Sequence, residues 1–228
     1  MPQPQELLST HLMSKYSLIR FTLTILITAY ACFWHAAAAS PAILVMGDSL
    51  SAAYGIDIDK GWVSLLDRKL KQCAYHYRVI NASVSGETTS GGLERLPRAL
   101  AQYKPSLVII ELGANDGLRG IDPRQIQKNL TRMIELSHQH RAEVLLIGMK
   151  IPINYGEAFR QRYYAVYKSV AGSTGVPLMP FLLRGVAQHS ALIQEDGLHP
   201  NASAQPALLD NVWSKVKPLL TNARSVEN

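Results

Sequence analysis

Short apolar runs rich in branched residues recur along the chain and alternate with longer segments. The well-defined runs are Ala42–Met46, Tyr77–Ile80, Leu107–Ile110 and Val144–Ile147, and a weaker one covers Pro177–Leu182. Runs of this length and composition are typical of strands in a parallel sheet, because both faces of such strands are buried. The segments between the runs are long enough to hold helices.

The clearest helical spacing follows residue 121. Its apolar positions fall on one helical face: Ile126, Leu130, Met133 and Ile134. Asp122 is the expected N-cap, and Pro123 stands at the first helical position, where the missing N–H of proline costs nothing. Strands that alternate with helices need crossover connections, which give a parallel sheet with helices on both faces. The pattern therefore predicts an α/β fold: a three-layer αβα sandwich with a mainly parallel five-stranded sheet, of the flavodoxin-like type.

The beginning of the chain has a different pattern. Lys15 and Arg20 precede an apolar stretch over Phe21–Trp34, and Ala36–Ser40 then supplies the small residues that signal peptidase requires. The apolar stretch is shorter than the ~20 residues needed to span a bilayer. This pattern predicts a cleaved secretory signal peptide.

We therefore expect residues 1–39 to be the signal peptide and residues 40–228 to be a single domain, located in the periplasm or secreted. Met13 stands just before the basic residues, and the segment before it, with two prolines and a glutamate, is atypical of a signal peptide. Met13 is therefore a candidate for the true start. A small residue before Cys32 leaves a lipoprotein signal as the alternative.

The composition is that of a folded protein. Of the 228 residues, 47% are hydrophobic and 18% charged, which excludes disordered and collagen-like chains. The formal net charge of +6 comes from dispersed residues, so it indicates no nucleic-acid partner and at most transient contact with a membrane surface. No cluster of cysteines and histidines indicates a metal or another cofactor, and Cys73, at the end of a predicted helix, is expected to be a buried small hydrophobe.

Polar, glycine-containing segments follow the first three predicted strands, at Gly47–Ser51, Asn81–Gly86 and Gly113–Gly117. A fourth such segment, Asp196–Pro200, precedes the last predicted helix, for which Asn201 is the expected N-cap. Ligands of open parallel sheets bind beyond the carboxyl ends of the strands. We therefore expect these segments to meet at one rim, where they bring a serine, a histidine and an aspartate together.

Ser49, His199 and Asp196 fit the chemistry of a nucleophilic serine. The serine hydroxyl needs a base, and His199 is the natural one, because no other histidine after residue 39 has a carboxylate so close within a glycine-containing turn. Asp196 lies three residues earlier and can bind the imidazole nitrogen that faces away from the serine. Each residue alone also has a structural interpretation, since serine and aspartate are common helix caps. For Asp48, a turn or capping role is expected.

In order and spacing, four blocks resemble the conserved motifs of the SGNH (GDSL) hydrolases: Gly47–Leu50, Gly86, Gly113–Asp116 and Asp196–Pro200. The resemblance covers nearly all of residues 40–228. Ala114 departs from the family pattern, because glycine is common before the asparagine. Within the family, Asn115–Gly120 and Ile151–Gly156 are similar to loops of the small bacterial periplasmic group of acyl-CoA thioesterases, arylesterases and lysophospholipases.

The resemblance implies a secreted serine esterase that hydrolyses carboxylic esters and thioesters, namely aryl esters, acyl-CoA and lysophospholipids, through an acyl-enzyme. Its catalytic residues would be Ser49, His199 and Asp196. The oxyanion hole would consist of the backbone N–H groups of Ser49 and Gly86 and the side-chain amide of Asn115. No metal or cofactor is expected for this chemistry.

The candidate substrate-binding residues are apolar loop residues that could line a groove for an acyl chain: Leu118, Ile151, Ile153 and Tyr155. A carbohydrate deacetylase with the same triad is the alternative enzyme. An α/β-hydrolase is disfavoured, because its nucleophile motif would need a glycine where Ser51 stands. A flavodoxin-like binding module is the alternative from another class, although no Gly-x-Gly-x-x-Gly fingerprint is present. The expected partner is a small ester, thioester or lysophospholipid, bound by a monomer.

Overall fold

The computed structural model of this protein describes residues 40–220. The predicted signal peptide, the candidate start at Met13 and the alternative at Cys32 lie outside the described residues. Within residues 40–220, no helix has both the length and the apolar character needed to cross a membrane.

The described part of the chain is built on one five-stranded sheet with the strand order β2-β1-β3-β4-β5. The strands are β1 (Ala42–Gly47), β2 (Arg78–Asn81), β3 (Leu107–Glu111), β4 (Glu143–Ile147) and β5 (Leu178–Met179). Every neighbouring pair is parallel. The predicted parallel sheet is confirmed. The first four strands lie within one residue of their apolar runs, and β5 takes up only two residues of the weaker run over Pro177–Leu182.

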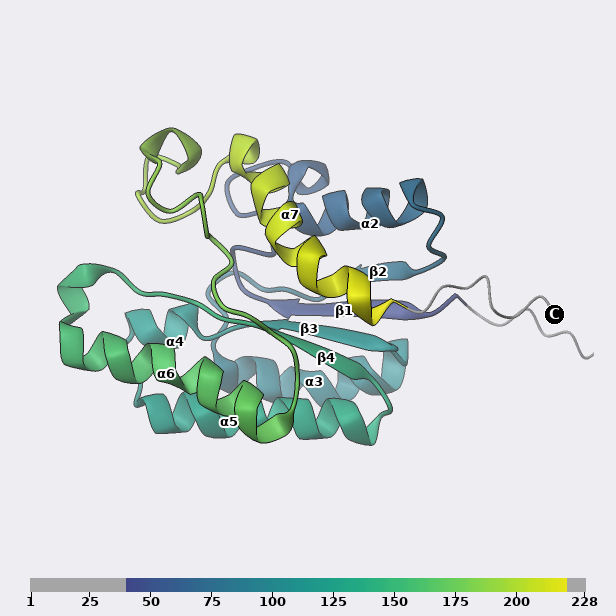
Figure 1. The fold of residues 1–228 in the computed structure, drawn as a ribbon, viewed down its shortest axis with the longest axis horizontal. Coiled ribbons are helices and arrows are strands. Elements are labelled where there is room, and N and C mark those ends of the chain that lie inside the picture. Colours follow the sequence, from purple (N-terminus) through teal and green to yellow (C-terminus); the bar gives the residue numbers. More distant parts are fainter. Residues whose placement is uncertain (1–39, 221–228) are drawn as a thin grey trace, which may run out of the picture. The chain divides into compact units, whose positions relative to one another are not determined.

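Helices cover both faces of the sheet. They are α2 (Trp62–Gln72), α3 (Thr89–Tyr103), α4 (Ala114–Leu118), α5 (Pro123–Gln139), α6 (Glu157–Thr174) and α7 (Gln205–Val216). Figure 1 shows α2 and α7 on one face and α3, α5 and α6 on the other. The three-layer αβα arrangement is therefore confirmed.

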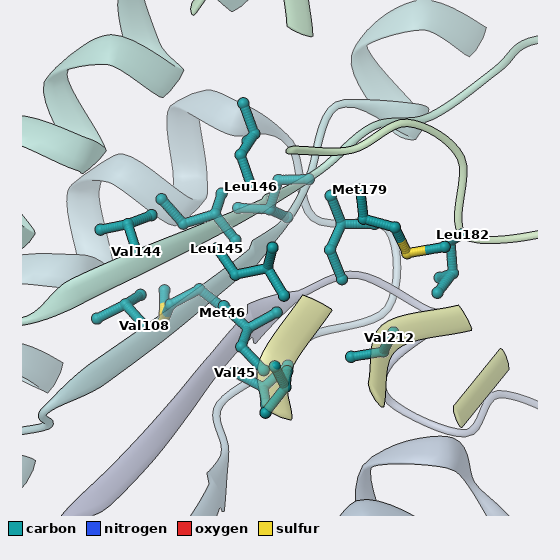
Figure 2. Close-up of a cluster of buried hydrophobic side chains, with 14 of the residues drawn as sticks. Val45, Met46, Val108, Val144, Leu145, Leu146, Met179, Leu182 and Val212 are labelled. Atoms are coloured by element: carbon teal, nitrogen blue, oxygen red, sulfur yellow. The ribbon is translucent and has the colours of Figure 1, made fainter. Parts of the chain in front are cut away.

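The core lies on both sides of the central strands. All residues of β1 and β3 are buried, whereas β2, at the edge of the sheet, is partly exposed. Figure 2 shows part of the buried apolar cluster, to which β1 contributes Val45 and Met46 and α7 contributes Val212. Complete burial explains why β1 and β3 read as continuous apolar runs. The rigid centre of the sheet fixes the positions of the loops at its carboxyl edge.

Helix α5 begins where the sequence predicts, after Asp122 as N-cap and with Pro123 as its first residue. The Asp122 side chain accepts a hydrogen bond from the Arg124 N–H, and Pro123 occupies the first helical position. Ile126 and the other apolar residues of its predicted face are buried. Asn201 caps a short 3-10 turn, Ala202–Ala204, which leads directly into α7.

The expectation for Cys73 was wrong. Cys73 is exposed and lies at the C-cap of α2, one residue beyond the last helical residue. The buried face of this helix ends at Leu70, and Ala74 adopts a left-handed conformation that turns the chain toward β2. Position 73 therefore leaves the helix before its side chain can join the core.

Candidate active site

The turn after β1 presents Ser49 at the carboxyl edge of the sheet. The Asp48 carbonyl accepts hydrogen bonds from the N–H groups of Ser51 and Ala52, which makes the turn tight. Gly47 is required at the end of the strand, because a Cβ there would lie 2.7 Å from the Ser51 side chain and 2.8 Å from the carboxyl oxygen of Glu111. Ser49 itself remains partly exposed.

Ser49, His199 and Asp196 lie in line, as the sequence predicts. The Ser49 Oγ is 2.8 Å from Nε2 of His199, and Nδ1 of the same ring is 2.6 Å from Oδ2 of Asp196. A carboxylate can only accept hydrogen bonds, so Nδ1 carries the ring hydrogen and Nε2 is free to accept the serine proton. The Tyr54 ring, 4.5 Å from the imidazole between ring centroids, covers the histidine.

The loop around Asp196 holds its carboxylate in the charged form. The backbone N–H groups of His199 and Leu198 donate to Oδ1 at 3.0 and 2.9 Å, and the imidazole binds Oδ2. These hydrogen bonds, the one from the His199 N–H first, lower the pKa of Asp196 to about 2. Asp196 is therefore ionised at neutral pH and can stabilise a histidine that has taken up a proton.

The residues predicted to supply the oxyanion donors, Ser49, Gly86 and Asn115, line one cleft. Ser49 and Gly86 both line the same cleft, and within residues 40–220 neither backbone N–H donates to another residue. Gly86 has a φ of +79°, a conformation that other residues adopt with strain. The Asn115 amide donates to Oδ2 of Asp48 at 3.2 Å and to the Glu87 carbonyl at 3.0 Å. To bind an oxyanion, Asn115 must share or exchange one of these bonds.

The turn that carries Asn115 is held from behind by two buried tyrosines of α6. The Tyr163 hydroxyl donates to the Gly113 carbonyl at 2.9 Å, and the Tyr167 hydroxyl donates to the Leu112 carbonyl at 3.0 Å. Burial raises the pKa of both hydroxyls well above the ordinary value, so they stay protonated as donors. Sequence analysis missed them, because nothing in their helical spacing distinguishes them from other core residues.

Asp48 and Glu111 form a buried carboxyl pair beneath the serine turn. Both side chains are inaccessible to solvent. Glu111 Oε2 accepts from the Ser51 hydroxyl at 2.6 Å and from the Asp48 N–H at 3.3 Å, and Asp48 Oδ1 accepts from the Leu50 N–H at 3.0 Å. Burial raises the pKa of Asp48 to about 6 and that of Glu111 well above its ordinary value. The turn role expected for Asp48 is confirmed, and its link to Asn115 is a further one.

A cleft of about 200 Å³ opens beside the serine and is mostly lined by apolar groups. Leu118 and Ile151 line it, as the sequence predicts. Ile153 does not, because a 3-10 turn at Ile153–Tyr155 leaves its side chain 80% exposed. Tyr155 also lies outside the lining, and its hydroxyl donates to the Leu118 carbonyl at 2.9 Å.

Several lining residues were not predicted: Tyr54, Met149, Lys150, Pro152, Leu183 and Leu198. They come from four separate loops, and only the folded chain brings them together. Position after a strand was the one available signal. It applied to Met149 and Lys150, which follow the fourth run, and to Leu183, which follows the weaker fifth run. Within the described residues, no group of three or more histidine, cysteine or acidic side chains is arranged to hold a metal ion.

The chain is similar in sequence and in structure to known esterases. The model of the GDSL-like Lipase/Acylhydrolase family matches residues 45–205. The chain is 50% identical over 183 residues to Esterase TesA of Pseudomonas aeruginosa, covering 80% of this chain and 91% of that protein. It is 39% identical over 186 residues to Thioesterase 1/protease 1/lysophospholipase L1 of Escherichia coli strain K12, covering 82% and 88%. A crystal structure of TesA superimposes with a TM-score of 0.77 at 50% identity and covers 78% of this chain and 99% of that one.

Proposed function

The chain belongs to the GDSL-like lipase and acylhydrolase family, and we propose that it cleaves carboxylic esters and thioesters through an acyl-enzyme on Ser49. The chain is thus an ester hydrolase, and the proposal concerns how it acts and on what. One observation carries it: Ser49, His199 and Asp196 are joined by contacts of 2.8 and 2.6 Å at the mouth of an apolar cleft.

In the proposed first half-reaction, Nε2 of His199 takes the proton of Ser49 as Oγ attacks the substrate carbonyl carbon. The ionised Asp196 stabilises the imidazolium that results. The carbonyl oxygen becomes an oxyanion, which accepts hydrogen bonds from the N–H groups of Ser49 and Gly86 and from the Asn115 amide. Collapse of this intermediate breaks the ester or thioester bond, and His199 gives its proton to the leaving alcohol or thiol.

In the second half-reaction, a water molecule attacks the acyl-enzyme with the same groups in the same roles. His199 takes a proton from the water, and the oxyanion forms again at the same donors. The carboxylic acid then leaves as Ser49 recovers its proton. No step needs a group other than the substrate, water and the residues described above.

The apolar lining of the cleft favours a substrate whose acyl group, which is transferred to Ser49, is a chain of several carbon atoms. Leu118, Met149 and Ile151 give it apolar walls beside the serine. Each methylene that enters such a cleft contributes up to ~0.8 kcal/mol. The similarity to a protein named thioesterase and lysophospholipase supports the same substrate class. Aryl esters, acyl-CoA and lysophospholipids are therefore the proposed substrates.

We also propose that the enzyme acts outside the cytoplasm as a monomer, with at most transient contact with a membrane surface. The support for export is the order of basic, apolar and small residues before Pro41. Cell fractionation with an antibody, together with the N-terminal sequence of the mature protein, tests export; a cytoplasmic protein that keeps residues 1–39 contradicts it.

The function is tested with purified mature protein and a series of p-nitrophenyl esters and acyl-CoA thioesters from acetyl to medium chain length. We expect kcat/KM to increase with chain length in both series, and Ser49→Ala to lose several orders of magnitude of activity while it stays folded. Ser83→Ala, at a serine of the neighbouring loop, is the control. A sharp preference for acetyl groups, above all on acetylated sugars, would favour the carbohydrate deacetylase instead.

A further inference from the structure

A second hollow, of about 170 Å³, lies beside the edge strand β5 and the end of α7. Its lining includes Lys150, Arg184 and Lys215, together with Phe181 and Asn211. We refer to it as the basic hollow. Its ionisable lining residues are all cations, and no carboxylate lines it. Three like charges around one small space repel one another, so this arrangement favours an anion.

Two of the three cations of the basic hollow, Lys150 and Arg184, are held by neighbouring side chains, and none of the three is neutralised. Within residues 40–220, none of the three forms an ion pair. The Lys150 ammonium lies 5.0 Å from the ring centre of Phe181. Asn211 donates to the Arg184 carbonyl at 2.8 Å and accepts from its guanidinium at 3.5 Å. The Arg184 loop is thus fixed to α7 while other guanidinium N–H groups stay available.

The basic hollow adjoins the catalytic cleft. Lys150 lines both, so a ligand that reaches past its side chain from the cleft would come to the basic hollow. Leu183 lines the cleft, and the next residue, Arg184, lines the basic hollow. Arg184 and Lys215 do not line the cleft, which separates their effects from the chemistry at Ser49.

We propose that the basic hollow binds a phosphate group carried by the leaving portion of the substrate, an inference that rests on the proposed ester and thioester hydrolysis. The apolar acyl chain offers no partner to three cations. In acyl-CoA and in lysophospholipids, by contrast, every phosphate lies on the thiol or alcohol side of the scissile bond. The planar guanidinium of Arg184 matches the oxygens of a phosphate, and the two ammonium groups add charge.

The test uses two pairs of substrates that share the acyl chain and the scissile bond but differ in phosphate. The thioester pair is octanoyl-CoA and octanoyl-N-acetylcysteamine, and the ester pair is an octanoyl lysophosphatidylglycerol and 1-octanoylglycerol. The double variant Arg184→Gln with Lys215→Gln changes exposed side chains, so it is expected to fold. Its matched control is Arg98→Gln with Lys128→Gln, two exposed residues on α3 and α5 that form no ion pair with any residue the structure describes.

We expect the double variant to lower kcat/KM for phosphate-bearing substrates about tenfold, mainly through KM, and to change the neutral substrates less than about twofold. The wild-type preference for phosphate should also weaken at high ionic strength, because salt screens exposed charges. Whichever phosphate-bearing substrate shows the selective loss identifies the source of the phosphate.

Equal losses on the phosphate-bearing and neutral members of a pair would overturn the proposal, as would no loss on either phosphate-bearing substrate. A control variant with the same selective loss would assign the effect to net charge and would also overturn it. Hydrolysis of p-nitrophenyl octanoate by the wild type separates the two proposals. If that activity is absent, ester hydrolysis at Ser49 fails; if it is present without selectivity in the variants, only the basic hollow fails.

Discussion

Two aspartates from different parts of the chain lie at the Ser49 site, Asp48 in the serine turn and Asp196 beside His199. Their surroundings shift their pKa values in opposite directions. Asp196 stands in a loop with its side chain 38% exposed, and its hydrogen bonds lower its pKa to about 2. Asp48 follows β1 and is fully buried beside Glu111, and burial raises its pKa to about 6. The same side chain is thus ionised down to low pH in one region and takes up a proton near pH 6 in the other.

The two aspartates differ in what surrounds the carboxyl group: hydrogen-bond donors around Asp196, and a buried space away from solvent around Asp48. Asp196 keeps its charge because N–H donors of its own loop replace water around the carboxylate, which is what a partner of a protonated histidine needs. Asp48 lacks water and is next to a second carboxyl group, so its charge costs free energy. It remains useful because it joins the serine turn, through the Leu50 N–H, to the Asn115 amide. In the proposed mechanism, the Asp196 region serves proton transfer, and the Asp48 region holds the oxyanion donors in place.

The largest expected effect comes from Asp196→Asn. The amide cannot stabilise the imidazolium and favours the wrong tautomer of His199, so kcat should fall ~10³–10⁴-fold with little change in KM. The measurement is steady-state hydrolysis of p-nitrophenyl octanoate. Asp57→Asn, at an exposed aspartate that pairs with Lys60, is the matched control and should keep full activity. A loss below tenfold in Asp196→Asn would mean that another group orients the histidine.

The second largest effect is expected at Asn115, whose amide donates a hydrogen bond to Asp48. Asn115→Ala removes one oxyanion donor while the N–H groups of Ser49 and Gly86 remain, so kcat should fall ~10²–10³-fold. KM should change little, because the donor acts mainly on the charge that develops in the transition state. The same steady-state assay measures both constants. A change in KM alone would instead make Asn115 a substrate-binding residue.

The sequence predicted some residues of the site and not others, and the reason is physical. Ser49, His199 and Asp196 were predictable, because each stands in a short motif next to a strand or helix whose position follows from local patterns. Glu111 was not, because it ends an apolar run, and only the register that places it opposite Gly47 brings it under the serine turn. Ile153 was misjudged because apolar character does not say which way a loop side chain points.

The raised pKa of the buried Asp48 predicts a pH dependence of the free energy of unfolding, which Asp48→Asn tests. Between the ordinary pKa of 3.8 and the folded value of about 6, the folded protein holds a proton on Asp48 that the unfolded chain has released. The free energy of unfolding should therefore fall as the pH rises through this window. Across this window the free energy of unfolding should fall by about 3 kcal/mol, because each pH unit corresponds to about 1.4 kcal/mol.

In the Asp48→Asn variant, this part of the pH dependence should disappear, and the part that belongs to Glu111 should move to lower pH, because the Asp48 charge no longer raises the Glu111 pKa. The measurement is urea unfolding of the wild type and the variant at several pH values from 4 to 8. Asp196 titrates below this window, since its pKa is about 2, so it does not interfere. An unchanged slope in the variant would show that Asp48 keeps its ordinary acidity in the folded protein.

The central claim is that Asp196 activates Ser49 through His199, whereas Asp48 only holds the turn. The most direct test is the rate at which a fluorophosphonate labels the wild type, Asp196→Asn and Asp48→Asn, with the modified residue identified by mass spectrometry. We predict stoichiometric labelling of Ser49, slowed about 10³-fold in Asp196→Asn and less than about tenfold in Asp48→Asn. Labelling of another residue, or an equal loss in the two variants, would contradict the claim.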